Sequence, residues 1–130
     1  MLDPLDAVVA APEHHKLLLE NDDFRVLETL ILPGDETKVH THKWGGYLYI
    51  LSWSDFIRYD GDGNIVLESR DIPVPPAPGT AILAPPLAPH SLRNVGQSNI
   101  HVILTEIKNP AATLNSAHLP LPAARKAESV

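Results

Sequence analysis

Short apolar runs separated by turn residues fill most of the chain, and this pattern predicts β-strands rather than long helices. Residues 24–32 and 100–107 are rich in β-branched and aromatic side chains, which favour strands. Pro33 and Gly34 end the first of these runs, and GDGN at residues 61–64 is a strong hairpin-turn signal. The expected strands are residues 14–21, 24–32, 37–42, 47–60, 65–69, 80–84, 90–95 and 100–107. Short strands spaced by about ten residues predict an all-β sandwich or barrel.

The segments between the strands are rich in proline and glycine. The chain has 13 prolines, and proline both breaks helices and blocks central positions of a sheet. The expected connections are a turn of helix within residues 4–10, tight turns at 43–46 and 85–89, and an extended connector at 71–79. Rigid turns of this kind favour many short strands over a few long elements.

The length and composition fit a single domain over residues 1–130. The 130 residues are 44% hydrophobic, which is enough for a packed core. We expect a barrel over about residues 14–108, followed by an Ala/Pro-rich tail over 109–130. No apolar run approaches the ~20 residues that cross a bilayer, and the first residues lack the basic segment of a signal peptide. We therefore expect a soluble, cytoplasmic protein.

Charge and cysteine content narrow the possible chemistry. The formal net charge is −6 and no Lys/Arg cluster is present, so we expect neither nucleic acid nor an anionic membrane as a partner. The chain has no cysteine, which excludes disulfides, thiolate metal sites and cysteine nucleophiles. Any metal must be held by histidine, carboxylate or backbone groups.

His40 and His42 are the first candidates for such chemistry. Residues two apart in a strand point to the same face, so both imidazoles face one way. They can chelate one divalent metal if a third ligand comes from another strand. The pair alone is a weak signal, and by itself it favours two polar residues on an exposed strand face.

Two longer motifs surround this pair. Gly34, five residues, His40, one residue and His42 form the first; Gly79, five residues, Pro85, four residues, His90, three residues and Asn94 form the second. In this order and spacing, the sequence resembles the cupin superfamily from about residue 24 to residue 107. The resemblance implies a double-stranded β-helix (jelly-roll) barrel that binds a metal through His40, His42 and His90.

The sequence departs from the cupin motifs at three positions. Gly46, or Tyr47 in the longer spacing, stands where the family has a glutamate ligand; Trp53 and Leu87 replace motif glycines. The resemblance therefore implies a site of three neutral imidazoles with no carboxylate. The missing side chain at Gly46 leaves room for a small anionic, chelating substrate. Imidazole ligands suit iron, zinc, nickel and copper alike, so the expected cofactor is a divalent metal ion whose identity stays open.

Further residues are expected around this site. Leu48 and Ile50 share a strand face with Gly46 and should fill the barrel. Trp44 either closes the pocket or caps the end of the barrel, and Asn94 is expected to satisfy buried backbone groups. The opposite face of the strand, with Tyr47, Tyr49 and Leu51, is apolar and should be covered by the N-terminal segment or by a second copy in a homodimer.

The remaining histidines and carboxylates have weaker signals. His14, His15 and His118 are expected to face solvent, and His101 to be a strand residue that makes a hydrogen bond. Glu28 and Glu106 lie in strands and are possible inward carboxylates whose facing the sequence leaves open.

Two functions are compatible with these patterns. The first is a metal-dependent enzyme, dioxygenase-like or lyase-like, that acts on a small anionic molecule. The second is a non-catalytic cupin that binds or senses a small ligand, since no general base is evident once the histidines bind metal. A purely structural domain is disfavoured because a barrel does not need imidazoles in its interior.

Overall fold

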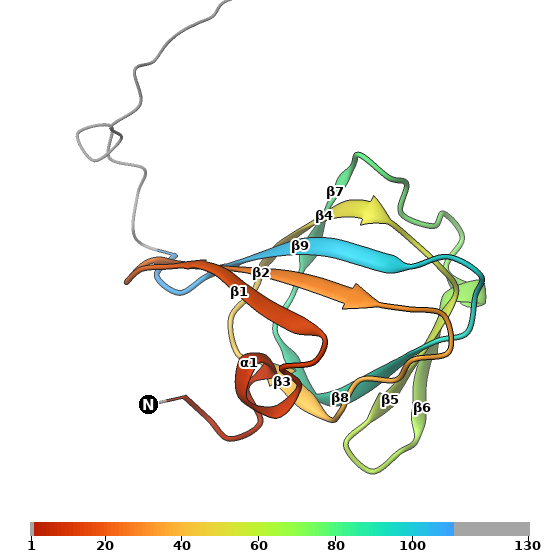
Figure 1. Cartoon of the computed structure of the whole chain (residues 1–130), viewed down its shortest axis with the longest axis horizontal. Helices are drawn as coiled ribbons and strands as arrows, with labels where there is room; N and C mark the ends of the chain where they lie inside the picture. Colours follow the sequence, from red (N-terminus) through yellow and green to blue (C-terminus); the bar gives the residue numbers. More distant parts are fainter. Residues whose placement is uncertain (1, 111–130) are drawn as a thin grey trace, which may run out of the picture.

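The chain folds into two facing β-sheets, seen in a computed structural model that describes residues 2–110 (Figure 1). The first sheet has the strand order β1-β2-β9-β4-β7, and the second β3-β8-β5-β6. The elements are α1 (Ala7–Ala10), β1 (His15–Glu20), β2 (Phe24–Ile31), β3 (His40–His42), β4 (Gly46–Ser52), β5 (Phe56–Asp60), β6 (Ile65–Glu68), η1 (Ser69–Asp71), β7 (Ala81–Ala84), β8 (Leu87–Asn94) and β9 (Ile100–Ile107).

The path of the chain is that of a double-stranded β-helix. From β2 to β5 the chain passes to the other sheet at each step, and it does so again from β6 through β9. All strand pairs are antiparallel, and β9 lies between β2 and β4 while β8 lies between β3 and β5. This confirms the all-β jelly-roll barrel expected from the sequence.

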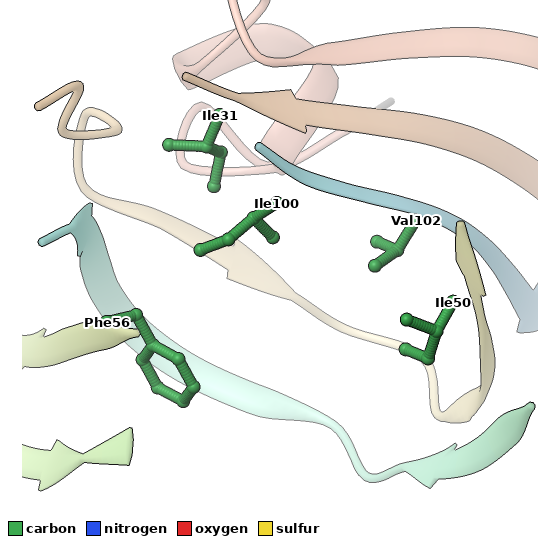
Figure 2. Packing of buried hydrophobic residues seen from close by; sticks show 5 residues of the cluster. All are labelled: Ile31, Ile50, Phe56, Ile100 and Val102. Carbon is green, nitrogen blue, oxygen red and sulfur yellow. The ribbon is translucent and has the colours of Figure 1, made fainter. Parts of the chain in front are cut away.

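The hydrophobic core lies between the two sheets and follows the alternation of the strands. In β9 every second residue is buried, and its partner strand β2 alternates in the same way. One cluster consists of Ile31, Ile50, Phe56, Ile100 and Val102, which point into the space between the sheets (Figure 2). A smaller cluster of Ala7, Leu27 and Leu104 packs α1 onto the barrel. Buried polar side chains, among them His15, His40, His42 and His90, lie outside these two clusters.

The structure corrects two of the expected boundaries. The run 47–60 is not one strand: β4 ends at Ser52 and β5 begins at Phe56, because the chain crosses between sheets there. The intervening backbone is held by β8 and its turn, since Ser54 Oγ donates to Asn94 Oδ1 over 2.8 Å and Val95 N donates to Asp55 O over 2.9 Å.

The second correction concerns the segment 85–89, which was expected to be a turn. Residues 87–89 belong to β8, and the register of β3 against β8 shifts between His40 and His42. Pro89 therefore lies beside an irregularity in the pairing, where a missing N–H is tolerated. The predicted strand 37–42 is correspondingly reduced to β3, and the helix within 4–10 to α1, which Asp6 caps by accepting from Val8 N over 3.1 Å.

The outer face of the larger sheet is apolar and exposed. Tyr47, Tyr49 and Leu51 are 44%, 44% and 42% exposed, as their alternation with Leu48 and Ile50 predicts, and Leu83 is 87% exposed. The second copy expected to cover this face stays a prediction.

Within residues 2–110, no helix is both long and apolar enough to cross a membrane. The tail from residue 111 and His118 lie outside the described residues.

Candidate metal centre

Four histidines from three strands meet inside the barrel. His40 and His42 come from β3, His90 comes from β8 where it pairs with His40, and His15 begins β1. The ring centroid of His40 lies 4.5 Å from that of His15, 5.0 Å from that of His42 and 4.4 Å from that of His90. One ring nitrogen from each of His15, His40 and His42 lies within 4.8 Å of the other two. His90 is outside that closest trio, but its ring also lies 5.5 Å from that of His42.

The expectation that His15 faces solvent was wrong, since its exposed fraction is 5%. His15 is the first residue of β1 and pairs with Thr29, a buried residue of β2, so its side chain points into the barrel. Its Nδ1 lies 3.0 Å from Ala11 O, just after α1. No motif marks His15, because its position depends on how the N-terminal segment folds back onto the barrel.

Nδ1 of each histidine forms a hydrogen bond with a carbonyl or carboxylate oxygen, which accepts. Nδ1 of His40 lies 2.7 Å from Lys38 O and Nδ1 of His90 lies 2.8 Å from Ala88 O. Nδ1 of His42 lies 2.9 Å from Glu106 Oε2. Because carbonyl and carboxylate oxygens accept, Nδ1 carries the hydrogen in all four rings, His15 included. Nε2 then keeps its lone pair, which is the form in which imidazole binds a metal.

The electrostatics of the cluster favour neutral imidazoles. Burial lowers the pKa of His15 and of His90 to about 4, and that of His40 to about 2, each from an ordinary value of 6.5. The neighbouring imidazoles lower these values further, because two positive charges would repel at such short range. At neutral pH these three rings are therefore uncharged, as metal ligation requires.

Glu106 is the buried carboxylate of the site, which answers the question that the sequence left open. It is fully buried, and besides His42 it accepts from Arg25 Nε over 2.6 Å. Arg25 in turn donates to both oxygens of Asp6, over 2.9 Å each. Burial works to lower the pKa of Arg25, but the hydrogen bonds and charges of Asp6 and Glu106 outweigh it and raise the value. Glu28 lies elsewhere, bonded to His101 Nε2 over 2.6 Å, which is the hydrogen bond expected for that histidine.

The expectation that Gly46 leaves room for a substrate was wrong. A Cβ at this position would overlap the carbonyl oxygen of Thr105, in the neighbouring strand β9. The space that a motif glutamate would need is therefore filled by backbone. A further polar group in the interior of the barrel is the imidazole of His15, which approaches from β1.

A cavity of about 120 Å³ adjoins the four histidines. Trp44 and Leu48 line it, whereas Gly46, Ile50 and Asn94 are not among its lining residues. Ile50 is part of the core cluster, and Asn94 bonds backbone groups of Ile31, Gly96 and Ser98. Within the described part of the chain, the lining contains no Asp or Glu, and Arg58 is its single Lys or Arg.

Comparisons with known proteins identify the fold. No protein-family model and no curated protein matches this sequence. Among solved structures, a cupin domain from Bordetella pertussis matches with a TM-score of 0.58 and 18% identity over 73% of this chain and 92% of that chain. An RmlC-like cupin family protein with a double-stranded β-helix fold, from Methanocaldococcus jannaschii, matches with a TM-score of 0.51 and 10% identity over 72% of this chain and 77% of that one. At these identities the likeness shows the fold alone, and this chain has the cupin fold.

Proposed function

We propose that this cupin-fold barrel binds one divalent metal ion through Nε2 of His40, His42 and His90, with His15 as a fourth imidazole. The observation that carries this proposal is the hydrogen bonding of the four rings. Each Nδ1 is committed to an acceptor, so four Nε2 lone pairs remain for the interior of the barrel. Neutral imidazoles and the absence of cysteine are compatible with iron, zinc or nickel, and with copper as well.

The protein residues around the metal would bind and orient rather than transfer protons. A bound metal would supply Lewis acidity and, if it is iron, oxygen activation. Thr29 and Thr37 are the hydroxyl residues of the described lining, and neither is an efficient general base. A lyase needs such a base, so we propose a dioxygenase-like enzyme that acts on a small anionic substrate. The same lack of a base also supports the alternative, a barrel that binds or senses a small ligand without turnover.

Metal stoichiometry tests the first step of this proposal. We expect elemental mass spectrometry of the untagged protein to give about one metal per chain, and the double variant His40→Ala/His42→Ala to give none. His101→Ala is the matched control, because this histidine bonds Glu28 on the outer face of the sheet. Wild-type protein that neither contains nor takes up a metal would contradict the proposal.

The enzyme and the binder respond differently to an added ligand. An enzyme of this class consumes oxygen when iron-loaded protein meets its substrate, and the His40→Ala/His42→Ala variant does not. A binder shows thermal stabilisation by the ligand with no product. Oxygen uptake and melting temperature, measured on the same panel of small carboxylates, distinguish the two.

A further inference from the structure

Arg58 is placed in the wall of the cavity without a protein partner for its charge. It lies in β5, paired with Leu92 of β8 and Leu67 of β6. Its Nε is buried and makes no hydrogen bond, and no carboxylate among residues 2–110 lies within ion-pairing distance. Burial lowers the pKa of Arg58, and no acidic neighbour offsets this effect.

Three other arginines lie in the described chain, and one of them, Arg93, is exposed and forms no ion pair there, so its charge stays in contact with water. Arg25 is fully buried, whereas Arg58 is half-buried, and Asp6 and Glu106 neutralise Arg25. Arg70 is exposed and lies 3.2 Å from Glu68. A donor of a charged group that is buried without a partner costs stability, because it loses its hydration and nothing replaces it. Arg58 therefore has hydrogen-bond donors available for an anion that enters the cavity.

Arg58 also lies close enough to the histidines to share a ligand with them. It lines the same cavity as His40, His42 and His90, and its charge contributes to the lowered pKa of His90. With a divalent metal in place, the cavity would hold positive charge from the metal and from Arg58, and its described lining has no acid to balance it. An anionic ligand would neutralise both.

The remaining walls indicate the rest of the ligand. A second cavity, of about 310 Å³, shares Arg58, Leu48, Trp53 and Phe56 with the first, so the two adjoin. Beyond the shared residues it is lined by Leu67, Ile72, Val74, Pro76 and Ile82, and it is bordered by Leu83, which pairs with Tyr47 and is 87% exposed on the outer face. These walls are apolar, which favours an apolar body and disfavours a sugar or a polyphosphate.

We propose that Arg58 selects the ligand of this barrel, an organic monocarboxylate whose headgroup accepts from the Arg58 guanidinium and whose apolar body occupies the adjoining cavity. A guanidinium offers two parallel donors to a carboxylate. A single arginine suits one such headgroup better than a dianionic phosphate, which usually requires several donors. This inference rests on the proposed metal site, because it names the substrate class of that site.

Calorimetric titration of paired probes tests it. Phenylacetate and hexanoate are titrated into the metal-loaded protein, with phenylacetamide, hexanamide and inorganic phosphate as comparisons. We expect the carboxylates to bind, the amides and phosphate to bind at least about tenfold more weakly, and Arg58→Gln to weaken carboxylate binding about ten- to hundredfold. Arg70→Gln is the matched control and should bind like wild type, because Arg70 is exposed in η1 and lines neither cavity.

The metal content of the same samples separates this inference from the proposed function. Arg58→Gln should keep its metal. Both Arg58→Gln and Arg58→Met should unfold at the wild-type temperature or above, because an unpaired charge is removed. If Arg58 had a structural role instead, replacing it would lower the unfolding temperature. Carboxylate binding that is unchanged in both variants, or amides or phosphate that bind as tightly as carboxylates, would overturn the role of Arg58 while a bound metal still supported the proposed function. Arg58-dependent binding in protein that takes up no metal would support Arg58 and contradict the metal site.

Discussion

At the scale of single residues, the metal centre depends on the groups behind the histidines as much as on the rings. Glu106 is fully buried and contacts both His42 Nδ1 and the guanidinium of Arg25. A carboxylate in this position fixes the tautomer and the orientation of the imidazole and makes Nε2 a better donor to a metal. Glu106 is therefore a positioning residue for His42.

Replacing Glu106 by glutamine should weaken the metal site without removing a ligand. The amide can still accept from His42, but it loses the negative charge and leaves Arg25 with fewer acceptors. We expect metal affinity to fall about 10- to 100-fold and the free energy of unfolding to fall by about 3 kcal/mol. Competition of Zn²⁺ with a chelating dye measures the first effect. Glu28→Gln, which breaks the other Glu–His pair, is the matched control; equal affinities of the two variants would refute this role of Glu106.

The lowered pKa values of His15, His40 and His90 predict how metal-free protein responds to acid. Their folded values lie below the unfolded value of 6.5, so below pH 6.5 the unfolded chain binds more protons and stability falls as pH falls. We expect a loss between pH 6.5 and 4 of up to about 1.4 kcal/mol per pH unit for each histidine. Urea unfolding in the presence of a chelator measures it, and His90→Gln should reduce the slope. A stability that is constant over this window would contradict neutral buried rings.

At the scale of elements, the close approach of β4 and β9 explains why Gly46 stands where the cupin motif has a glutamate ligand. Gly46 pairs with Glu106, and β9 passes so near that the backbone of Thr105 occupies the place of a side chain. The glycine is a packing requirement of this strand pair. The same close pairing places β9 where Glu106 reaches His42 from behind.

Gly46→Ala tests this packing directly. Its Cβ would overlap the backbone of β9, which cannot move without breaking the strand pairing. We expect a loss of about 3 kcal/mol in the free energy of unfolding, at the upper end for overpacked sites. Gly45→Ala should cost less, because its nearest contact would be Pro86 Cδ at 3.1 Å. If urea unfolding gave both variants wild-type stability, β4 and β9 would not be packed as described.

Much of the strand pattern could be predicted from the sequence, because alternation and turn residues are local signals. Residues 24–32 and 100–107 match β2 and β9 closely. The crossing at residues 53–55 was missed because an apolar segment that changes sheets looks like a continuing strand. Residues 87–89 were missed because proline signals a turn, and the irregular pairing that tolerates Pro89 is set by another strand, β3.

At the scale of the whole molecule, the site is assembled from distant parts of the chain. The spacing of His40, His42 and His90 predicted a common site, since the cupin-like motifs carry it. His15 and Glu106 lie in no motif, and their roles depend on the way β1 and β9 close the barrel around β3. The link from Asp6 through Arg25 to Glu106 also connects α1 to the site. Such contacts cannot be predicted from local patterns.

The exposed face of the larger sheet leads to a prediction about assembly. Tyr47, Tyr49 and Leu83 lie side by side on β4 and β7, and burying them would favour association. We expect light scattering to give twice the chain mass of 14.2 kDa. Tyr49→Glu should reduce this to the mass of one chain, whereas Ile65→Glu, in β6 of the other sheet, should not. A wild-type protein that stays at the single-chain mass at high concentration would refute the homodimer.

The central claim, that four Nε2 atoms face one metal, is tested most directly by ¹⁵N NMR of the imidazole nitrogens. In metal-free protein at neutral pH, we predict hydrogen on Nδ1 of His15, His40, His42 and His90. One equivalent of Zn²⁺ should shift their Nε2 resonances and leave that of His101 unchanged. The claim would be contradicted by hydrogen on Nε2 of His40 and His42, or by Nε2 resonances of the four histidines that do not shift when zinc is added.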